Sequence, residues 1–176
     1  ILAVLVISVT VFFKITAIEV LGESRYSASE LIRTTGISAG DNMFMINKYT
    51  AIKHLFDAYP YLDEVRMKRK LPGTLEIIVK DSVPAACVAE PAEAGGFWLI
   101  DIDGKLLEKT DGAQEAPGLP IITGLTLKNP KAGENLTTEE GEQEKALTEI
   151  LHTAANNAIL KNVQEVNVER LYQLTL

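Results

Sequence analysis

Cysteine and histidine are scarce in this chain of 176 residues, which has one cysteine, Cys87, and two histidines, His54 and His152. A single cysteine excludes a disulfide within the chain and a metal site built from cysteines. Two isolated histidines leave little material for acid–base catalysis or zinc binding. The composition therefore argues against an enzyme or a metalloprotein.

A surplus of basic side chains is also missing, because 17 Lys and Arg stand against 24 Asp and Glu, for a formal net charge of -7. Binding to a phosphate backbone requires clustered Lys and Arg, so we expect no nucleic-acid partner. The negative charge is unevenly distributed: the chain is nearly neutral up to Val88, and the acidic surplus follows it. Such a shift in composition predicts a domain boundary near the middle of the chain.

The opening segment, Ile1 to Phe13, has no charged residue and only two polar ones. As a helix it would span about 20 Å, which is short of the ~30 Å hydrocarbon core of a bilayer. We interpret residues 1–14 as the distal part of a single transmembrane helix, with Lys14 at the interface. A buried β-strand and the core of a signal peptide are the alternatives, although no cleavage site of the small-x-small kind follows.

Two helices are predicted after a short first strand, in which Ile18 and Val20 alternate with residues on the other face. Ser27 and Glu30 have the spacing of a capping box, in which the two side chains satisfy free N–H groups of the first helical turn. A second helix is predicted from Asn47 to about Ala58, because apolar residues recur there at helical spacing. Each helix therefore presents one apolar face to a core.

A hairpin follows the helices, because apolar and charged residues alternate on both sides of the turn Leu71-Pro72-Gly73. A three-stranded sheet with two helices on one face is the simplest arrangement that buries both helices. We therefore predict an α+β fold with a β-α-α-β-β domain over residues 15–82. Residues 83–176 are predicted to form a second, β-rich domain with one long helix. We expect this domain to continue beyond Leu176.

The segment Asp101 to Gly104 is the first candidate for chemistry, as the start of a calcium loop or as a source of an aspartate nucleophile. The further oxygen ligands and the final glutamate of a calcium-binding loop do not follow it, so we interpret it as a hairpin turn. Cys87 has no histidine near it in sequence, which favours a small buried hydrophobic residue over a nucleophile. His54 and His152 lie beside the apolar faces of their helices. We therefore predict no catalytic, cofactor-binding or metal site.

The one concentrated charge feature is the basic run at residues 66–70. Because side chains alternate along a strand, Arg66, Lys68 and Lys70 share one face of the predicted strand. That face is a candidate surface for an anionic partner or for the membrane. A solvated strand face beside neighbouring glutamates is the alternative.

Several short motifs follow one another along nearly the whole chain. They are IEVLG at 18–22, GDNMF at 40–44, VRMKRKLPGTLEI at 65–77, VPAA at 83–86, WLID at 98–101 and LPIITG at 119–124. In this order and spacing they resemble the FtsQ/DivIB family of bacterial cell-division proteins. The basic strand with its LPGT turn is the most specific part of the resemblance.

The resemblance implies a protein with a single membrane span, a POTRA domain and a β-domain, the bulk of it on the extracytoplasmic side of the cell membrane at the division septum. It implies no catalysis and no cofactor. The implied partners are membrane proteins of the divisome, namely FtsL-like and FtsB/DivIC-like coiled-coil proteins, through which the protein helps control septal peptidoglycan synthesis. A POTRA module of a polypeptide-transport or outer-membrane assembly system is the first alternative, and an enzyme of the cell envelope is the second.

Such a protein would bind partners by strand addition, in which a partner segment pairs with the free N–H and C=O groups of a sheet edge. The candidate edge is the last predicted strand, with Tyr172, Leu174 and Leu176 on one face. An interior strand covered by further residues is the alternative. We therefore take Tyr172, Leu174, Leu176 and the basic strand as the candidate partner-binding residues.

Overall fold

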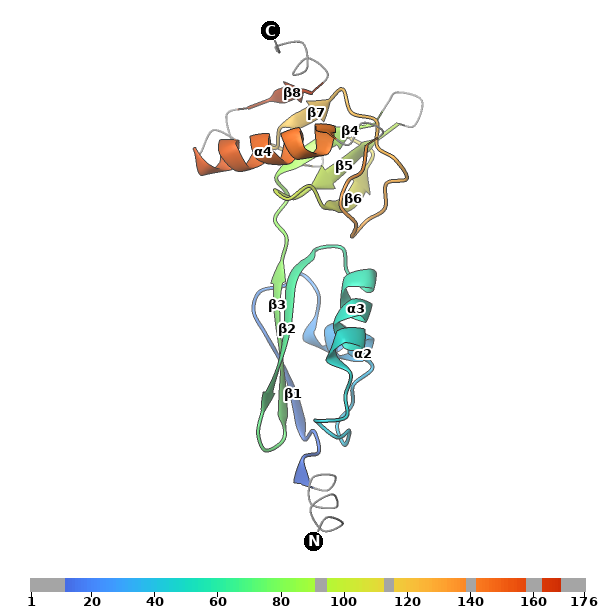
Figure 1. Cartoon of the computed structure of the whole chain (residues 1–176), viewed down its shortest axis with the longest axis vertical. Helices are drawn as coiled ribbons and strands as arrows, with labels where there is room; N and C mark the ends of the chain where they lie inside the picture. Colours follow the sequence, from blue (N-terminus) through green and yellow to red (C-terminus); the bar gives the residue numbers. More distant parts are fainter. Residues whose placement is uncertain (1–11, 91–94, 113–115, 139–141, 158–162, 169–176) are drawn as a thin grey trace. The chain divides into compact units, whose positions relative to one another are not determined.

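The computed structural model describes residues 12–90, 95–112, 116–138, 142–157 and 163–168 (Figure 1). The chain divides into two compact units, the N-terminal unit Ile1–Asp81 and the C-terminal unit Ser82–Leu176. Each unit contains its own sheet and its own cluster of buried apolar side chains. The architecture is therefore α+β in both units.

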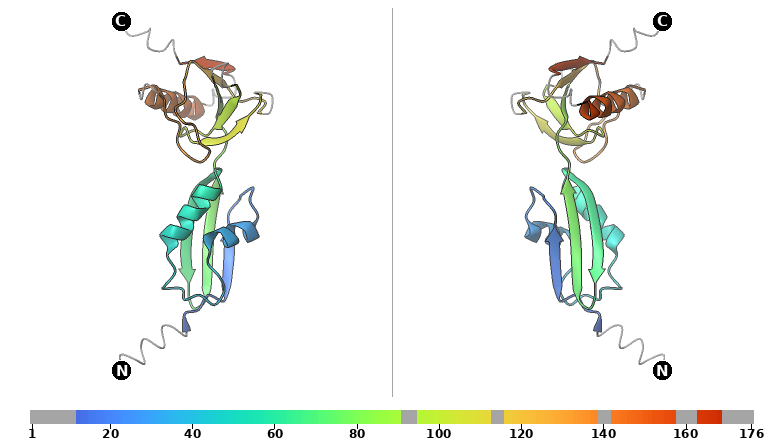
Figure 2. Two further views of the ribbon diagram at one scale, coloured as in Figure 1. Left: turned by 90° about the vertical axis from the view of Figure 1, so that its right-hand side faces the viewer. Right: turned by 90° about the vertical axis from the view of Figure 1, so that its left-hand side faces the viewer.

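The N-terminal unit has the predicted order of strand, helix, helix, strand and strand. Its elements are β1 (Ala17–Leu21), α2 (Ala28–Thr35), α3 (Lys48–Ala58), β2 (Leu62–Lys70) and β3 (Thr74–Asp81). In the three-stranded sheet, β3 lies in the centre, antiparallel to β2 and parallel to β1. Both helices cover the same face of this sheet (Figure 2), which confirms the arrangement predicted from sequence.

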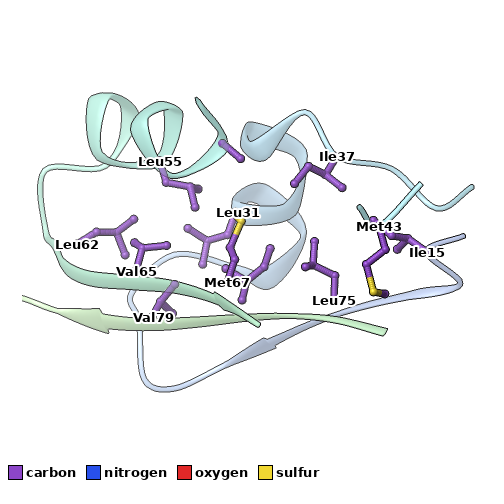
Figure 3. Close-up of a cluster of buried hydrophobic side chains, with 12 residues drawn as sticks. Ile15, Leu31, Ile37, Met43, Leu55, Leu62, Val65, Met67, Leu75 and Val79 are labelled. Carbon is purple, nitrogen blue, oxygen red and sulfur yellow. The ribbon is translucent and has the colours of Figure 1, made fainter. Parts of the chain in front are cut away.

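The core of the N-terminal unit lies between the sheet and the two helices (Figure 3). Leu31 of α2 and Leu55 of α3 are fully buried and share this core with Leu75 and Ile77 of β3. Neighbouring positions on β3 point to the opposite face and are less buried. The apolar residues that alternate with charged ones in the sequence of this strand therefore lie on the face of the sheet that the helices cover.

Both helices begin at the residues that the sequence predicts. The Ser27 hydroxyl accepts a hydrogen bond from the Glu30 backbone N–H at 3.3 Å, and the Glu30 carboxylate accepts one from the Ser27 N–H at 3.1 Å. Asn47 caps α3, because its side-chain oxygen accepts from the N–H groups of Tyr49 and Thr50. These contacts satisfy donors that have no partner within the helix.

The turn after β1 requires glycine. Gly22 has a φ of +106°, and a Cβ at this position would lie 2.0 Å from the carbonyl oxygen of Val79. Any other residue would be strained and would also clash with the backbone of β3. Gly22 thus lets the chain leave β1 while β1 stays paired with β3.

The C-terminal unit is built from shorter strands and one long helix. Its elements are β4 (Ala86–Ala89), β5 (Phe97–Ile100), β6 (Leu106–Thr110), β7 (Ile121–Thr123), α4 (Glu142–Asn156) and β8 (Glu165–Asn167). The sheet order is β6-β5-β4-β7-β8, with antiparallel pairing on the β6 side and parallel pairing of β4 with β7 and of β7 with β8. The hairpin β5–β6 and the long helix α4 are as predicted, and β4 begins shortly after Pro84.

The helix α4 contributes Leu147 and Leu151 to the core of the C-terminal unit. They are buried in one cluster with Ala86 of β4, Ile100 of β5 and Ile122 of β7. This face of the helix is the apolar face that the spacing of its leucines predicts.

Within the described ranges, no helix combines the length and the apolar character needed to cross a bilayer. Residues 1–11, most of the segment predicted to be a membrane span, lie outside those ranges. The end of that segment is described, and Lys14 forms an antiparallel bridge with Asn42. The chain therefore enters the N-terminal unit immediately after Phe13.

Candidate partner-binding site

The residues weighed as catalytic candidates do not assemble into a reactive site in the described part of the chain. No three side chains of His, Cys, Asp or Glu come together there in a way that could hold a metal ion. Cys87 is buried in β4, and this burial raises the pKa of its thiol. Little nucleophilic thiolate is therefore present near neutral pH. His54 is exposed on α3, as expected.

Asp101 is buried and acts as the organiser of the turn between β5 and β6. Its Oδ1 accepts hydrogen bonds from the backbone N–H groups of Asp103 and Lys105, at 3.0 and 2.9 Å. Its Oδ2 accepts one from the Ser82 hydroxyl at 2.8 Å. A carboxylate satisfied by three donors of its own fold is a structural group, which confirms the interpretation of this segment as a hairpin turn.

His152 is brought next to an aspartate that the sequence does not pair with it. Its Nε2 lies 3.0 Å from Oδ1 of Asp103, so that α4 is tied to the β5–β6 turn. Both side chains are substantially exposed. An exposed pair of this kind contributes little to stability. We interpret it as a surface contact between α4 and the β5–β6 turn.

The basic residues predicted on β2 lie on an edge strand of the sheet. Val65 and Met67 are buried, whereas Arg66, Lys68 and Lys70 are exposed on the other face, away from the helices. The predicted sharing of one face is therefore observed.

Two of the three cations are paired within the sheet. Arg66 contacts Glu64, and the Lys70 ammonium lies 3.2 Å from the carboxylate of Glu76. In the described ranges no carboxylate lies within 4 Å of the Lys68 ammonium, although Lys68 is opposite Glu76 in the strand register. The Arg66–Glu64 pair is exposed, and such pairs are worth only about 0–1 kcal/mol, so a partner could displace it at small cost.

The second set of predicted partner-binding residues, Tyr172, Leu174 and Leu176, lies outside the described residues. The last described strand is β8, which pairs in parallel with β7 and forms one end of the five-stranded sheet as described. The predicted strand follows β8 along the chain. That this segment forms the edge of a sheet therefore stays a prediction.

Arg69 has a role that sequence analysis missed. Its Nε donates a hydrogen bond to the carbonyl of Met43 at 2.7 Å, and its guanidinium lies 5.6 Å from the centre of the Phe44 ring. Alternation along β2 places Arg69 on the same side as Met67, which was the available signal that it differs from the other cations. Arg69 thus connects the end of β2 to the loop before α3.

The comparisons with known proteins agree with the arrangement of the elements. The family model described as "POTRA domain, FtsQ-type" matches residues 13–81. The chain is 29% identical over 174 residues to "Cell division protein FtsQ" of Geobacter sp. (strain M21), an alignment that covers 97% of this chain and 60% of that protein. The family match and the names of the relatives support the FtsQ/DivIB family for this chain.

Two further relatives are named DivIB. The chain is 25% identical over 168 residues to "Cell division protein DivIB" of Clostridium tetani, covering 94% of this chain and 60% of the relative. It is 30% identical over 149 residues to the DivIB of Clostridium botulinum (strain Loch Maree / Type A3), covering 84% and 56%.

The FtsQ-type match ends at Asp81, which is the last residue of β3 and of the N-terminal unit. That unit is the POTRA domain of this chain. The names of the relatives support a role in cell division. The chain spans about 60% of the length of the FtsQ of Geobacter and the DivIB of C. tetani, so the partners and the activity of the whole protein are matters for proposal.

Proposed function

We propose that this chain is a non-enzymatic scaffold of the bacterial divisome, held in the cell membrane by a single span that includes residues 1–14. The bulk of the chain lies on the extracytoplasmic side at the septum. It links FtsL-like and FtsB/DivIC-like coiled-coil proteins and thereby helps control septal peptidoglycan synthesis. The observation that carries this proposal is the alignment of nearly the whole chain with FtsQ and DivIB cell division proteins.

The order of elements supports this proposal over a polypeptide-transport module. Such a module would be expected to repeat the β-α-α-β-β unit. In the described ranges that order occurs once, and the C-terminal unit runs as four strands, the helix α4 and a fifth strand. The POTRA domain is thus followed by a different fold, as in the scaffold that we propose.

Partner binding is proposed to occur by strand addition beside β8. A strand at the end of a sheet has backbone N–H and C=O groups on its outer side that a partner strand can pair with. The segment with Tyr172, Leu174 and Leu176 follows β8 in the sequence. It would form the next strand of the sheet, and the partner strand would pair with its free edge. Its alternating apolar side chains would fill pockets of the partner and provide specificity.

The basic strand is proposed as a second contact, for an acidic segment of a partner. Lysines on an edge strand discourage pairing with unrelated strands, because they place charge where a neighbour would dock. A partner strand with acidic side chains would instead complement Arg66, Lys68 and Lys70. Lys68 is the most informative of them, since its ammonium has no carboxylate within 4 Å in the described ranges.

The first test uses Gln173→Pro, which removes a backbone donor from the predicted strand, with Gln173→Ala as the matched control. Each variant of the full chain is co-purified with the FtsL-like and FtsB/DivIC-like proteins of the same genome. We expect the proline variant to lose at least tenfold in capture and the alanine variant to bind as the unchanged chain does. Equal capture by the two variants would contradict strand addition at this segment.

The second test reverses one charge on β2 with Lys68→Glu, and Lys53→Glu on the exposed face of α3 serves as the control. If an acidic partner segment docks on the basic strand, the β2 variant should lose several-fold in capture, and the loss should shrink at high salt. The emission of Trp98 and the circular dichroism of both variants check that they fold. An equal effect of both variants would mean that only net charge matters.

A further inference from the structure

One end of the POTRA domain exposes four large apolar side chains. Phe12 is 74% exposed, Phe44 49%, Met45 78% and Leu71 56%. Isolated exposed apolar residues are ordinary on protein surfaces, whereas a group of them gathered in one place marks an interaction site. These four side chains indicate an interaction site only if they lie at the same place on the surface.

Backbone hydrogen bonds hold the three segments that carry them at the same end of the sheet. The N–H of Met43 donates to the carbonyl of Phe13 at 2.8 Å, and the N–H of Thr16 donates to the carbonyl of Gly73 at 2.7 Å. A Cβ on Gly73 would lie 2.5 Å from Oγ1 of Thr16, so the β2–β3 turn and the residue that precedes β1 are in close contact. The rings of Phe13 and Phe44 pack edge to face with their centres 5.1 Å apart.

The same end of the domain is positively charged, although the chain as a whole is acidic. Lys14, Lys68, Arg69 and Lys70 are exposed there. The nearby acidic groups are Glu76, which is paired with Lys70, Glu19, which lies opposite Glu76 in the strand register, and Asp41, whose carboxylate accepts a hydrogen bond from the Ser38 N–H. A positive excess remains around the apolar group.

Aromatic and apolar side chains combined with lysine and arginine are the composition of surfaces that sit in the headgroup region of a bilayer. We propose that this end of the POTRA domain, formed by Phe12, Phe44, Met45 and Leu71 with Lys14 and Arg69, docks on anionic lipid headgroups. The apolar side chains enter the boundary with the acyl chains, and the cations contact lipid phosphates. This inference rests on the membrane attachment put forward under Proposed function.

Continuity of the chain favours a lipid surface over a protein partner. The uncharged segment Ile1 to Phe13 runs directly into Lys14, with no linker between them. A bilayer that holds this segment therefore meets this surface before any other part of the domain. The opposite end, with Glu23 and Asp81, is about 25 Å away, since β3 has eight residues at ~3.3 Å each.

The test places one environment-sensitive fluorophore on the full chain in a Cys87→Ala background, at Met45→Cys or Leu71→Cys, with Glu23→Cys as the matched control. Each labelled chain is mixed with vesicles of phosphatidylglycerol or of phosphatidylcholine, and flotation measures attachment. With phosphatidylglycerol, we expect quenching by lipid-borne nitroxides to be at least threefold stronger at positions 45 and 71 than at 23. The emission of Trp98 checks that the background variant folds.

The outcomes separate the docking surface from the membrane attachment. If the chain floats with the vesicles but all three probes are quenched equally, the docking surface is overturned and the attachment stands. If the chain does not float with either lipid, both are overturned. If the probes at positions 45 and 71 are quenched as strongly in phosphatidylcholine vesicles as in phosphatidylglycerol vesicles, the preference for anionic lipid is overturned. If the emission of these probes changes only when a partner protein is added, lipid is overturned as the occupant.

Discussion

The POTRA domain and the C-terminal unit of this chain build their sheets in different ways. In the POTRA domain, two strands of nine and eight residues are joined by a short turn and form most of the sheet. In the C-terminal unit the strands are three to five residues long. Two of their pairings are parallel and join segments that are distant in sequence. The first sheet depends mainly on local pairing, and the second depends on contacts across the unit.

The two units also differ in how they satisfy polar groups. The POTRA domain uses exposed helix caps such as Ser27 and Asn47. The C-terminal unit buries two carboxylates, Asp101 with its three donors and Glu90 with Trp98 and Lys109. A buried charge without its partners is costly, whereas an exposed cap contributes a modest amount. Loss of a polar group should therefore cost more in the C-terminal unit.

The largest effect is expected from removing core side chains, and it tests whether the two cores are separate. Leu55→Ala should lower the free energy of unfolding of the POTRA domain by about 2–5 kcal/mol, because Leu55 is fully buried. The only tryptophan, Trp98, belongs to the other core. In urea unfolding, circular dichroism should show an earlier transition for Leu55→Ala, and Trp98 emission should not. Leu147→Ala should do the reverse, and a shared shift would mean that the two units unfold as one.

Asp101→Ala should have the next largest effect. It leaves the N–H groups of Asp103 and Lys105 and the Ser82 hydroxyl without their acceptor, which should cost about 1–3 kcal/mol. The unfolding transition reported by Trp98 emission measures the loss. Asp103→Ala, which removes only the exposed contact with His152, is the control and should change stability by less than about 1 kcal/mol. Equal losses would show that Asp101 does not organise the turn.

A smaller effect is expected at the helix cap of the POTRA domain. Ser27→Ala removes the acceptor for the Glu30 N–H and should cost about 1 kcal/mol, whereas Ser27→Gly should cost only a few tenths. Circular dichroism during thermal unfolding measures both. If Ser27→Ala cost as much as Asp101→Ala, the contrast between exposed caps and buried carboxylates would not hold.

The smallest effect is expected from acid, because protonation of Glu90 removes its charge but leaves the side chain in place. Burial alone would raise the pKa of Glu90, but the ion pair with Lys109 and the hydrogen bond from Trp98 outweigh it and hold that pKa below its usual value of 4.5. Because the pKa is lower in the folded state, Glu90 stabilises the C-terminal unit above about pH 4.5, and this contribution is lost as the pH falls through the folded-state pKa.

Trp98 reports this titration directly, since its Nε1 donates to the Glu90 carboxylate at 2.9 Å. Its emission should change with a midpoint below pH 4.5, and Glu90→Gln should abolish that change. A midpoint above 4.5 would mean that burial prevails over Lys109 and Trp98.

The candidate partner-binding residues show where sequence information stops. Alternation correctly placed Arg66, Lys68 and Lys70 on one exposed face, because neighbours on a strand always point to opposite sides. The strand register, which alternation leaves open, places Lys68 opposite Glu76, and the ion pair of Glu76 with Lys70 forms diagonally between the two strands. The association of Glu90, Trp98 and Lys109 joins three positions that no motif connects, and sequence analysis missed it.

The sequence by itself determined the helices, the long hairpin and the turn at Asp101, because capping, periodicity and turn formation act between residues that are a few positions apart. Tertiary structure alone decided the parallel place of β1 beside β3 and the position of Phe44, Met45 and Leu71 at the same end of the POTRA domain. Those arrangements depend on contacts such as Arg69 to Met43 and Thr16 to Gly73, which join residues 26 and 57 positions apart. Such contacts form only when the whole core is assembled, so no local pattern specifies them.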